Sequence, residues 1–234
     1  MHQFLPENGK VQPAIKFQGY DKGTDEKDDE RTIILAKANM LVYLSDILSK
    51  YHSEEYLKQF SENAFNEVFR LLRSNLGTYA KIDESEKYDL ILTHPPYVTS
   101  GSASVKNAIE HAGLSNYYAS GGRGTESLAI QWIVKHLKPG GQAFVIVPDG
   151  LLNQEVVLDF IKTECEVLAV CALPSRTFYS TPKKTYILGL RRKSEKVEQT
   201  APVFTYLVTE IGESRDTRRV PIEKNDLTQM VSEF

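Results

Sequence analysis

The stretch Tyr88–Gly101, "YDLILTHPPYVTSG", decides the fold of this chain. Its first six residues are mostly apolar, which predicts a buried β-strand. Two consecutive prolines then end the strand, because proline lacks the N–H that a sheet ladder requires and its φ angle is fixed. The stretch therefore predicts a rigid loop, His94–Tyr97, at the carboxyl end of a buried strand.

Composition narrows the class of protein. The chain has 234 residues, of which 41% are hydrophobic and 25% are charged, as in an ordinary globular protein. A net charge of −3 excludes a general electrostatic nucleic-acid binder, so a nucleic-acid site would be a local patch. The sequence shows neither a signal peptide nor an apolar run of the roughly 20 residues that a membrane helix needs. Cys165 and Cys171 have neither metal-ligand nor disulfide-framework spacing. We expect a cytoplasmic protein with no membrane partner and no metal.

Apolar strand-like segments alternate with helical segments along most of the chain. This alternation predicts an α/β fold with a mostly parallel sheet. The Gly- and Ser-rich segment Val98–Gly124 is predicted to be a surface loop. The predicted strands are Ala14–Gly23, Tyr88–Thr93, Gln142–Pro148, Val167–Pro174 and Lys183–Arg192, and the predicted helices are Thr32–Lys50, residues 53–73, Thr125–Lys138 and Glu155–Cys165.

Two helical segments carry more detailed expectations. Ile34, Leu41, Leu44 and Leu48 fall on one face of the first helix, which predicts an amphipathic helix packed against a core. Thr125 is expected to cap the helix that it begins.

Ligands of parallel sheets bind beyond the carboxyl ends of the strands. This rule places Tyr20–Asp21, His94–Tyr97 and Pro148–Asp149 along one crevice. Each of these strand ends carries polar or unusual residues. The sequence therefore predicts an enzyme-like site there, although a fold alone does not determine a function.

The segment Asp89–Tyr97 resembles the (Asn/Asp/Ser)-Pro-Pro-(Tyr/Phe) motif of S-adenosylmethionine-dependent amino-methyltransferases. Two further blocks, "LKPGGQAFVIVPDGLL" and "ALPSRTFYSTPKKTYILGL", are similar to the adenine-N6 DNA methylases that serve as modification subunits of type I restriction systems. The resemblance extends from about Phe17 to about Arg192 and keeps the order and spacing of the blocks.

The resemblance implies a fold and a set of partners. The fold would be that of a class I S-adenosylmethionine-dependent methyltransferase, a Rossmann-like α/β sheet with helices on both faces, incomplete on its N-terminal side. Residues 1–234 would form one partial catalytic domain, with a core at about 14–192 and the start of a C-terminal extension at 193–234. The cofactor would be S-adenosyl-L-methionine and the substrate double-stranded DNA. The partners would be the specificity and restriction subunits of a type I-like system.

The resemblance also assigns catalytic roles. In the family, the target adenine is flipped out of the DNA, and its amino group donates its two hydrogens to a side-chain oxygen and to the carbonyl of the first proline. These roles fall on His94, which also borders the cofactor, and on the main chain of Pro95. Pro96 would keep the loop rigid. Tyr97 would stack on the base, and Phe178 would close the pocket from the other side.

Contacts to the cofactor and to DNA phosphates are assigned in the same way. Asp21 matches the acid that binds the ribose hydroxyls of the cofactor. Ser74 or Asn75 stands near the place where the family has an acid that holds the adenine ring of the cofactor. Lys183 and Lys184 are candidates for substrate contacts at DNA phosphates, with a solvated strand end as the alternative.

Besides the missing acid near Ser74, the sequence departs from the family at two further places. The glycine-rich loop that lies against the methionine part of the cofactor has no counterpart. Its strand would lie between the strands at Ile15 and Leu90, so these two are predicted to face a gap, and the chain is expected to be a fragment of a longer methylase. His94 stands where the family has Asn. A neutral imidazole offers one acceptor nitrogen, which argues against efficient catalysis.

Two other functions remain open at this point. A catalytically decayed methylase relative would serve to bind DNA or partner subunits, and His94 and the missing loop favour it. A protein-glutamine methyltransferase would use the same loop on a side-chain amide. The block "FYSTPKKT" argues against that second alternative.

Overall fold

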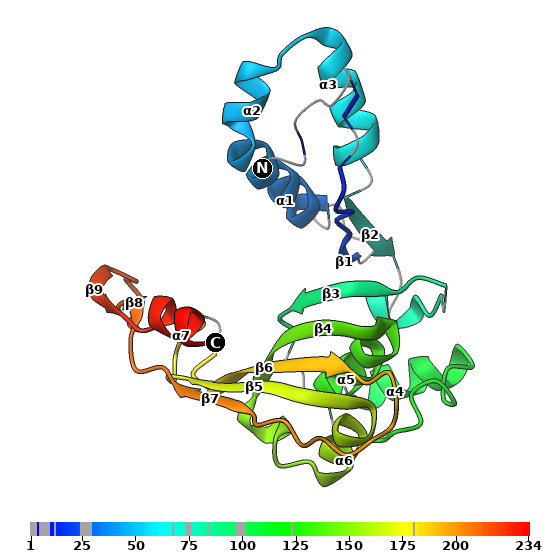
Figure 1. The fold of residues 1–234 in the computed structure, drawn as a ribbon. Coiled ribbons are helices and arrows are strands. Elements are labelled where there is room, and N and C mark those ends of the chain that lie inside the picture. The colour runs from blue at the N-terminus through cyan, green and yellow to red at the C-terminus, as the bar shows by residue number, and fades with distance from the viewer. Residues whose placement is uncertain are drawn as a thin grey trace. The chain divides into compact units, whose positions relative to one another are not determined.

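The computed structural model describes residues 4, 10–11, 13–23, 30–66, 68–73, 76–83, 85–96, 102–122, 124–179 and 181–234. Its backbone divides into two compact units, Met1–Lys81 and Ile82–Phe234 (Figure 1). The expected single catalytic domain over 1–234 stays a prediction. Within these described ranges, no helix is long and apolar enough to cross a membrane.

The first unit combines a two-stranded parallel sheet with short helices. Strand β1 (Gly19–Gly23) pairs with β2 (Phe69–Arg73). Its core is a cluster in which Tyr56 and Phe60 pack with Phe4, and the Tyr56 hydroxyl donates a 3.0 Å hydrogen bond to the Phe4 carbonyl. The helical elements are α1 (Glu30–Tyr43), α2 (Ser45–Lys50), α3 (Glu54–Phe60), a π-helical turn (Ser61–Phe65) and a 3-10 turn (Gly77–Ala80).

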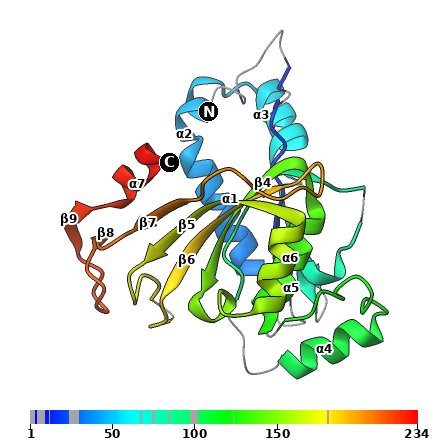
Figure 2. The same ribbon diagram turned by 60° about the horizontal axis from the view of Figure 1, so that its bottom comes forward.

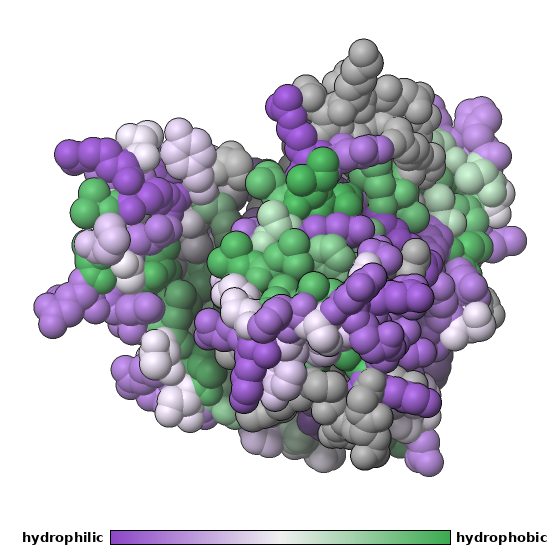
Figure 3. All heavy atoms as spheres, turned by 90° about the horizontal axis from the view of Figure 1, so that it is seen from above, coloured by the Kyte–Doolittle hydropathy of each residue, from purple (hydrophilic) through white to green (hydrophobic). Residues whose placement is uncertain are grey.

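Two helix predictions for this unit are wrong. The helix predicted over 53–73 ends at Phe65, and Phe69–Arg73 forms β2 instead, because pairing with β1 overrides a weak local helix preference. The helix predicted over Thr32–Lys50 breaks at Leu44, which is buried, whereas Ile34 and Leu41 are exposed. The core of this unit is formed mainly by α2 and α3, and α1 buries none of its residues. Apolar residues at the surface are visible on the face drawn in Figure 3.

The second unit is built on a five-stranded mixed sheet of order β3-β4-β6-β5-β7. Strand β3 (Tyr88–Thr93) runs parallel to β4 (Leu137–Pro148), and β5 (Cys165–Leu173) runs parallel to β7 (Phe204–Leu207). Only β6 (Thr185–Arg192), which lies between β4 and β5, is antiparallel to both neighbours. The predicted α/β architecture is confirmed, with this one strand reversed.

Helices flank this sheet. α5 (Gly124–His136) and α6 (Glu155–Glu164) lie together against one face (Figure 2). Alternate residues of β4 are buried, namely Ala143, Val145 and Val147. Residues of β5–β7 that lie on the other face of the sheet, among them Cys171 and Ile187, form a separate cluster with Met230 and Leu227 of α7 (Leu227–Glu233). The remaining elements are α4 (Ser102–His111), the turn Asp149–Leu151, and the antiparallel hairpin of β8 (Ile211–Glu213) and β9 (Pro221–Asn225).

Two predictions for the second unit need correction. The predicted surface loop contains α4, because the Gly and Ser residues gather at its ends and leave "SASVKNAIEH" free to form a helix. Strand β3 is not buried on both faces: Leu90 is 53% and Leu92 is 69% exposed. Among the described strands β3 pairs with β4 alone, so its side chains lack a second neighbouring strand that would help to cover them. β1 and β3 belong to separate sheets, one in each unit, and the predicted gap between them stays a prediction.

Candidate active site

The strand register of the second unit brings several predicted site segments to one edge of the sheet. Pro148 at the carboxyl end of β4 and Leu173 at the carboxyl end of β5 both lie opposite Thr185, the first residue of β6. Thr93, the last residue of β3, lies opposite Val145 in the same direction. The loops that follow β3, β4 and β5 and the segment that precedes β6 therefore emerge at the same edge, where ligands of such sheets bind.

His94 and Phe178 contact each other at this edge. Their ring centroids are 4.2 Å apart, and the ring planes are inclined by 47°. His94 is exposed as a residue, but partial desolvation of its ring lowers its pKa from the ordinary value of 6.5 and favours the neutral imidazole at pH 7. It then has one donor and one acceptor nitrogen. The sequence placed these two side chains on opposite sides of a pocket, whereas the structure places them in direct contact.

The proline loop is held from helix α5. Pro95 is buried and Pro96 is exposed, and the Thr125 hydroxyl donates a 2.8 Å hydrogen bond to the Pro96 carbonyl. Thr125 itself is only 4% exposed. The expectation that Thr125 caps the helix is wrong: the helix begins at Gly124, and the hydroxyl bonds to the loop instead. Since the φ angle of Pro96 is fixed by its ring, this bond also restricts the direction of the Pro95 carbonyl. No sequence signal links residues this far apart.

The next residue, Glu126, is a buried carboxylate. It is 7% exposed, and its Oε2 has no hydrogen-bond partner within the described ranges. The carboxylate lies against Gly124, where a Cβ atom would stand 2.4 Å from Oε2. The φ angle of Gly124 is +80°, so glycine suits this position on both counts. Glu126 is therefore a candidate acceptor in the first turn of α5, next to Thr125.

The end of β4 is tied to the start of β6. The Tyr186 hydroxyl donates a 3.1 Å hydrogen bond to Asp149 Oδ1, and the Asp149 amide donates one of 3.2 Å to the Lys184 carbonyl. Lys183 and Lys184 are exposed, and the Lys184 ammonium lies 5.4 Å from the centre of the Tyr186 ring. The edge thus presents two exposed cations; their contact with DNA phosphates stays a prediction, as does the alternative of a solvated strand end.

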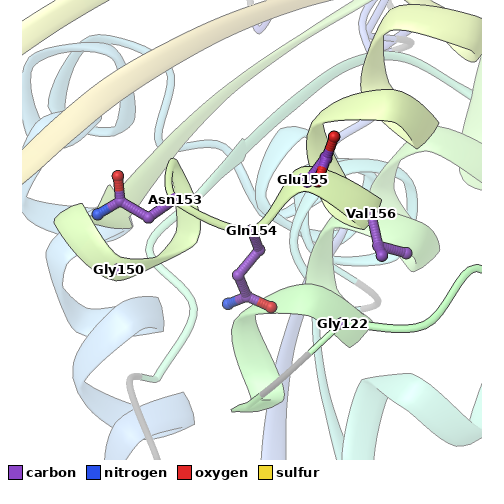
Figure 4. Close-up of a pocket in the computed structure, with 6 residues that line it drawn as sticks. All are labelled: Gly122, Gly150, Asn153, Gln154, Glu155 and Val156. Atoms are coloured by element: carbon purple, nitrogen blue, oxygen red, sulfur yellow. The ribbon is translucent and has the colours of Figure 1, made fainter.

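A shallow pocket opens beside this edge, after β4 and at the start of α6. Figure 4 shows the Gln154 side chain extending toward Gly122, while Glu155 points the other way. Gly150, Asn153 and Val156 complete the lining. Sequence analysis gave no indication of this pocket.

The other predicted site residues lie outside the described residues or in the first unit. Tyr97 and Ser74 lie outside the described residues. Asp21 belongs to the first unit, where it lies opposite Leu71 in the middle of β1 and not at the strand's end. Its side chain is partly buried. The predicted crevice is therefore described on the side of the second unit only.

The family model described as N-6 DNA Methylase matches residues 3–234. Among solved structures, a type I restriction enzyme modification subunit from Vibrio vulnificus is similar at 19% identity, with a TM-score of 0.55, over 76% of this chain and 38% of that one. A type I restriction-modification methyltransferase subunit from Streptococcus thermophilus is 14% identical over 76% of this chain and 37% of that one, with a TM-score of 0.48.

A protein from Listeria monocytogenes described as a class I S-adenosylmethionine-dependent methyltransferase is 18% identical, with a TM-score of 0.47, over 84% of this chain and 60% of that one. The chain thus spans less than two thirds of each of these three proteins. No curated protein matches it.

The contact between His94 and Phe178 generates a titration test. We expect the His94 pKa to lie below 6.5 and to rise toward 6.5 in Phe178→Leu, because that change removes a ring that covers the imidazole. NMR titration of the histidine ring protons measures this. Phe178→Tyr retains the ring and should keep the pKa low. Because the unfolded chain binds this proton more readily, stability should fall as the pH drops below 6.5. A His94 pKa at or above 6.5 in the unsubstituted chain would contradict this picture.

The bond between Thr125 and Pro96 generates a stability test. Thr125→Val keeps the shape of the side chain and removes its donor. We expect the free energy of unfolding to fall by about 1 kcal/mol, a typical value for one hydrogen bond. Urea denaturation measures the change. Thr125→Ser retains the hydroxyl and should lose less, and equal stability of the Val variant and the unsubstituted chain would show that the bond contributes nothing.

Proposed function

The chain belongs to the N-6 DNA methylase family, and from this premise we propose that it is an adenine-N6 DNA methyltransferase of the modification-subunit type. Its fold is that of the class I S-adenosylmethionine-dependent methyltransferases, with a mixed sheet flanked by helices. The proposed reaction transfers the methyl group of S-adenosylmethionine to the amino group of an adenine that is flipped out of double-stranded DNA.

The observation that carries this proposal is the anchored loop His94–Pro96 at the carboxyl edge of the sheet. The amino nitrogen of adenine is a weak nucleophile because its lone pair is delocalised into the ring. Two acceptors that bind its two hydrogens would localise the lone pair on nitrogen. The Pro95 carbonyl is one acceptor, and the unprotonated nitrogen of His94 is the other. Thr125 holds the loop in place through the Pro96 carbonyl, 2.8 Å from its hydroxyl.

The residues of the chain fit one part of the cofactor. The Asp21 carboxylate, partly buried on β1, has the acceptor chemistry that the ribose hydroxyls require. The sequence contains no glycine-rich loop to receive the methionine part. When bound, the cofactor supplies the methyl group. We therefore propose a cofactor site that this chain completes only in part, with weak affinity.

His94 limits the proposed reaction. The Asn of the family offers a carboxamide oxygen, whereas the neutral imidazole offers a single nitrogen on a larger ring. The His94 ring also contacts the Phe178 ring, with 4.2 Å between the ring centroids. An entering base would therefore have to separate the two rings. The same contact favours the second candidate function, a decayed relative that binds DNA or partner subunits without turnover.

Partners are proposed on the same basis. Lys183 and Lys184, exposed at the edge of the sheet, would contact DNA phosphates and would orient the duplex without reading its sequence. Specificity and restriction subunits would supply base recognition and cleavage, in the cytoplasm. With a net charge of −3, the chain has little general attraction for DNA, so a separate recognition subunit suits it.

The cofactor site is tested by calorimetric titration of S-adenosylmethionine. We expect saturable, weak binding, and we expect Asp21→Ala to weaken it about ten-fold or more, because hydrogen bonds to a charged group are worth about 1.5–3 kcal/mol. Asp21→Asn keeps the shape and loses the charge, so it should fall between the two. Binding that Asp21→Ala leaves unchanged would remove Asp21 from the site. No binding at all would favour the non-catalytic candidate.

The role of His94 is tested by substitution with the residue of the family. His94→Asn should raise incorporation of labelled methyl groups into adenine of duplex DNA by about 100- to 1000-fold, the usual effect of one transition-state hydrogen bond. His94→Ala removes the acceptor and serves as the matched control. If His94→Asn is no faster than His94→Ala, the loop does not act on the adenine amino group as proposed.

A further inference from the structure

We propose that Arg219, in the hairpin β8–β9, is a positioning residue that holds Phe178 against His94. This inference rests on the proposed function for its catalytic meaning, but the contact itself is independent of turnover. It assigns a role in the candidate active site to residues after Arg192, which the sequence placed in a C-terminal extension outside the catalytic core.

Arg219 bonds to the two residues that directly precede Phe178. Its Nη2 donates a 2.9 Å hydrogen bond to the Arg176 carbonyl, and its Nη1 donates one of 3.0 Å to the Thr177 carbonyl. The same Nη1 lies 3.0 Å from Glu213 Oε1 on β8. The Arg219 side chain is only 18% exposed, so these bonds form in a largely dehydrated place.

The chemistry of the guanidinium suits this task. Its donors lie in one plane in a fixed fork, so two carbonyls that bond to it are held in a set orientation. Lysine, with a single ammonium on a flexible stem, would not fix both. The arginine therefore sets the direction in which the chain enters Phe178.

The loop that carries Phe178 needs such an external hold. Arg176 has a φ angle of +64°, in the left-handed region that non-glycine residues disfavour. Within the loop, Thr177 donates from its hydroxyl and its amide to the Pro174 carbonyl, at 2.6 and 3.3 Å. These two bonds close a local turn, and Arg219 attaches that turn to the hairpin.

The hairpin is itself anchored. The Ser214 amide donates to the Val220 carbonyl at 2.8 Å, and the Val220 amide donates to the Ser214 hydroxyl at 2.9 Å. These two bonds close the segment in which Arg219 lies. Phe178 also packs on the apolar cluster that contains Met230 and Ile211. The segment after β6 thus holds the Phe178 loop through both polar and apolar contacts, from more than 40 residues along the chain.

The structure thus makes the geometry of His94 dependent on Arg219. Loss of Arg219 should release the Phe178 loop and remove the Phe178 ring from the imidazole. In the proposed reaction this would change the turnover rate and the apparent affinity for DNA.

The test uses NMR of the histidine ring protons in the full chain, because an adjacent aromatic ring displaces their resonances. The difference in His94 chemical shift between Phe178→Leu and the unsubstituted chain measures the effect of the Phe178 ring. We expect Arg219→Ala to produce the larger part of this difference, and Arg219→Lys to shift the His94 resonance in the same direction. Arg218→Ala is the matched control: its side chain is 80% exposed and pairs with Asp216 at 3.2 Å, so His94 should not move.

His52, His111 and His136 report on folding in the same spectra. If Arg219→Ala disturbs all of them, the chain has lost its fold, and Arg219→Lys, which retains the charge beside Glu213, decides the question. An unshifted His94 resonance in a folded Arg219 variant would overturn the proposal. The spectra need no methyl transfer, so a chain without activity contradicts the proposed function and leaves this result readable.

Discussion

The pairing of β6 with both β4 and β5 is the constraint on which the second unit depends. Because β6 runs antiparallel to its two neighbours, its first residue, Thr185, lies opposite the last residues of both strands, Pro148 and Leu173. This register alone brings the "PKK" segment, the turn after β4 and the Phe178 loop to one edge. A parallel β6 would carry its two lysines to the opposite edge of the sheet.

Loops at such an edge have no ladder partners, so their conformation must be held from elsewhere. Two side chains far apart in sequence do this in the described structure. Thr125, on α5, bonds to the carbonyl of Pro96, and Arg219, in the C-terminal hairpin, bonds to the carbonyls that precede Phe178. Both are largely buried, and both use main-chain acceptors, so they fix the course of a loop and leave its side chains free to act.

His94 concentrates the chemical question that the structure raises. Contact with Phe178 and partial burial favour a neutral ring, which retains one acceptor. A protonated ring would have none. Desolvation therefore preserves the acceptor nitrogen of the His94 ring. The same ring contact occupies part of the space that a base would enter. The site therefore has an acceptor that could bind the adenine amino group, and it also has a ring contact that occupies part of the space for the base.

Much of this protein was determined by the sequence itself. Apolar runs bounded by proline and glycine located β3, β4, β5 and β6, and the block pattern from Asp89 to Arg192 indicated the family that the whole-chain match shows. His94 and Phe178 were both identified from local motifs, because the residues of a motif lie close together in the sequence.

Only the tertiary structure decided the rest. Phe69–Arg73 became a strand because β1 pairs with it, and Leu92 became exposed because, among the described strands, β3 pairs with β4 alone. Thr125 and Arg219 act across 29 and more than 40 residues, through one and two hydrogen bonds to carbonyls respectively, and such bonds leave no periodic or compositional trace. Local sequence patterns specify which segments form strands and which residues are buried. A hydrogen bond from a side chain to a distant carbonyl can be made by many kinds of donor, so it is determined only when the chain is packed.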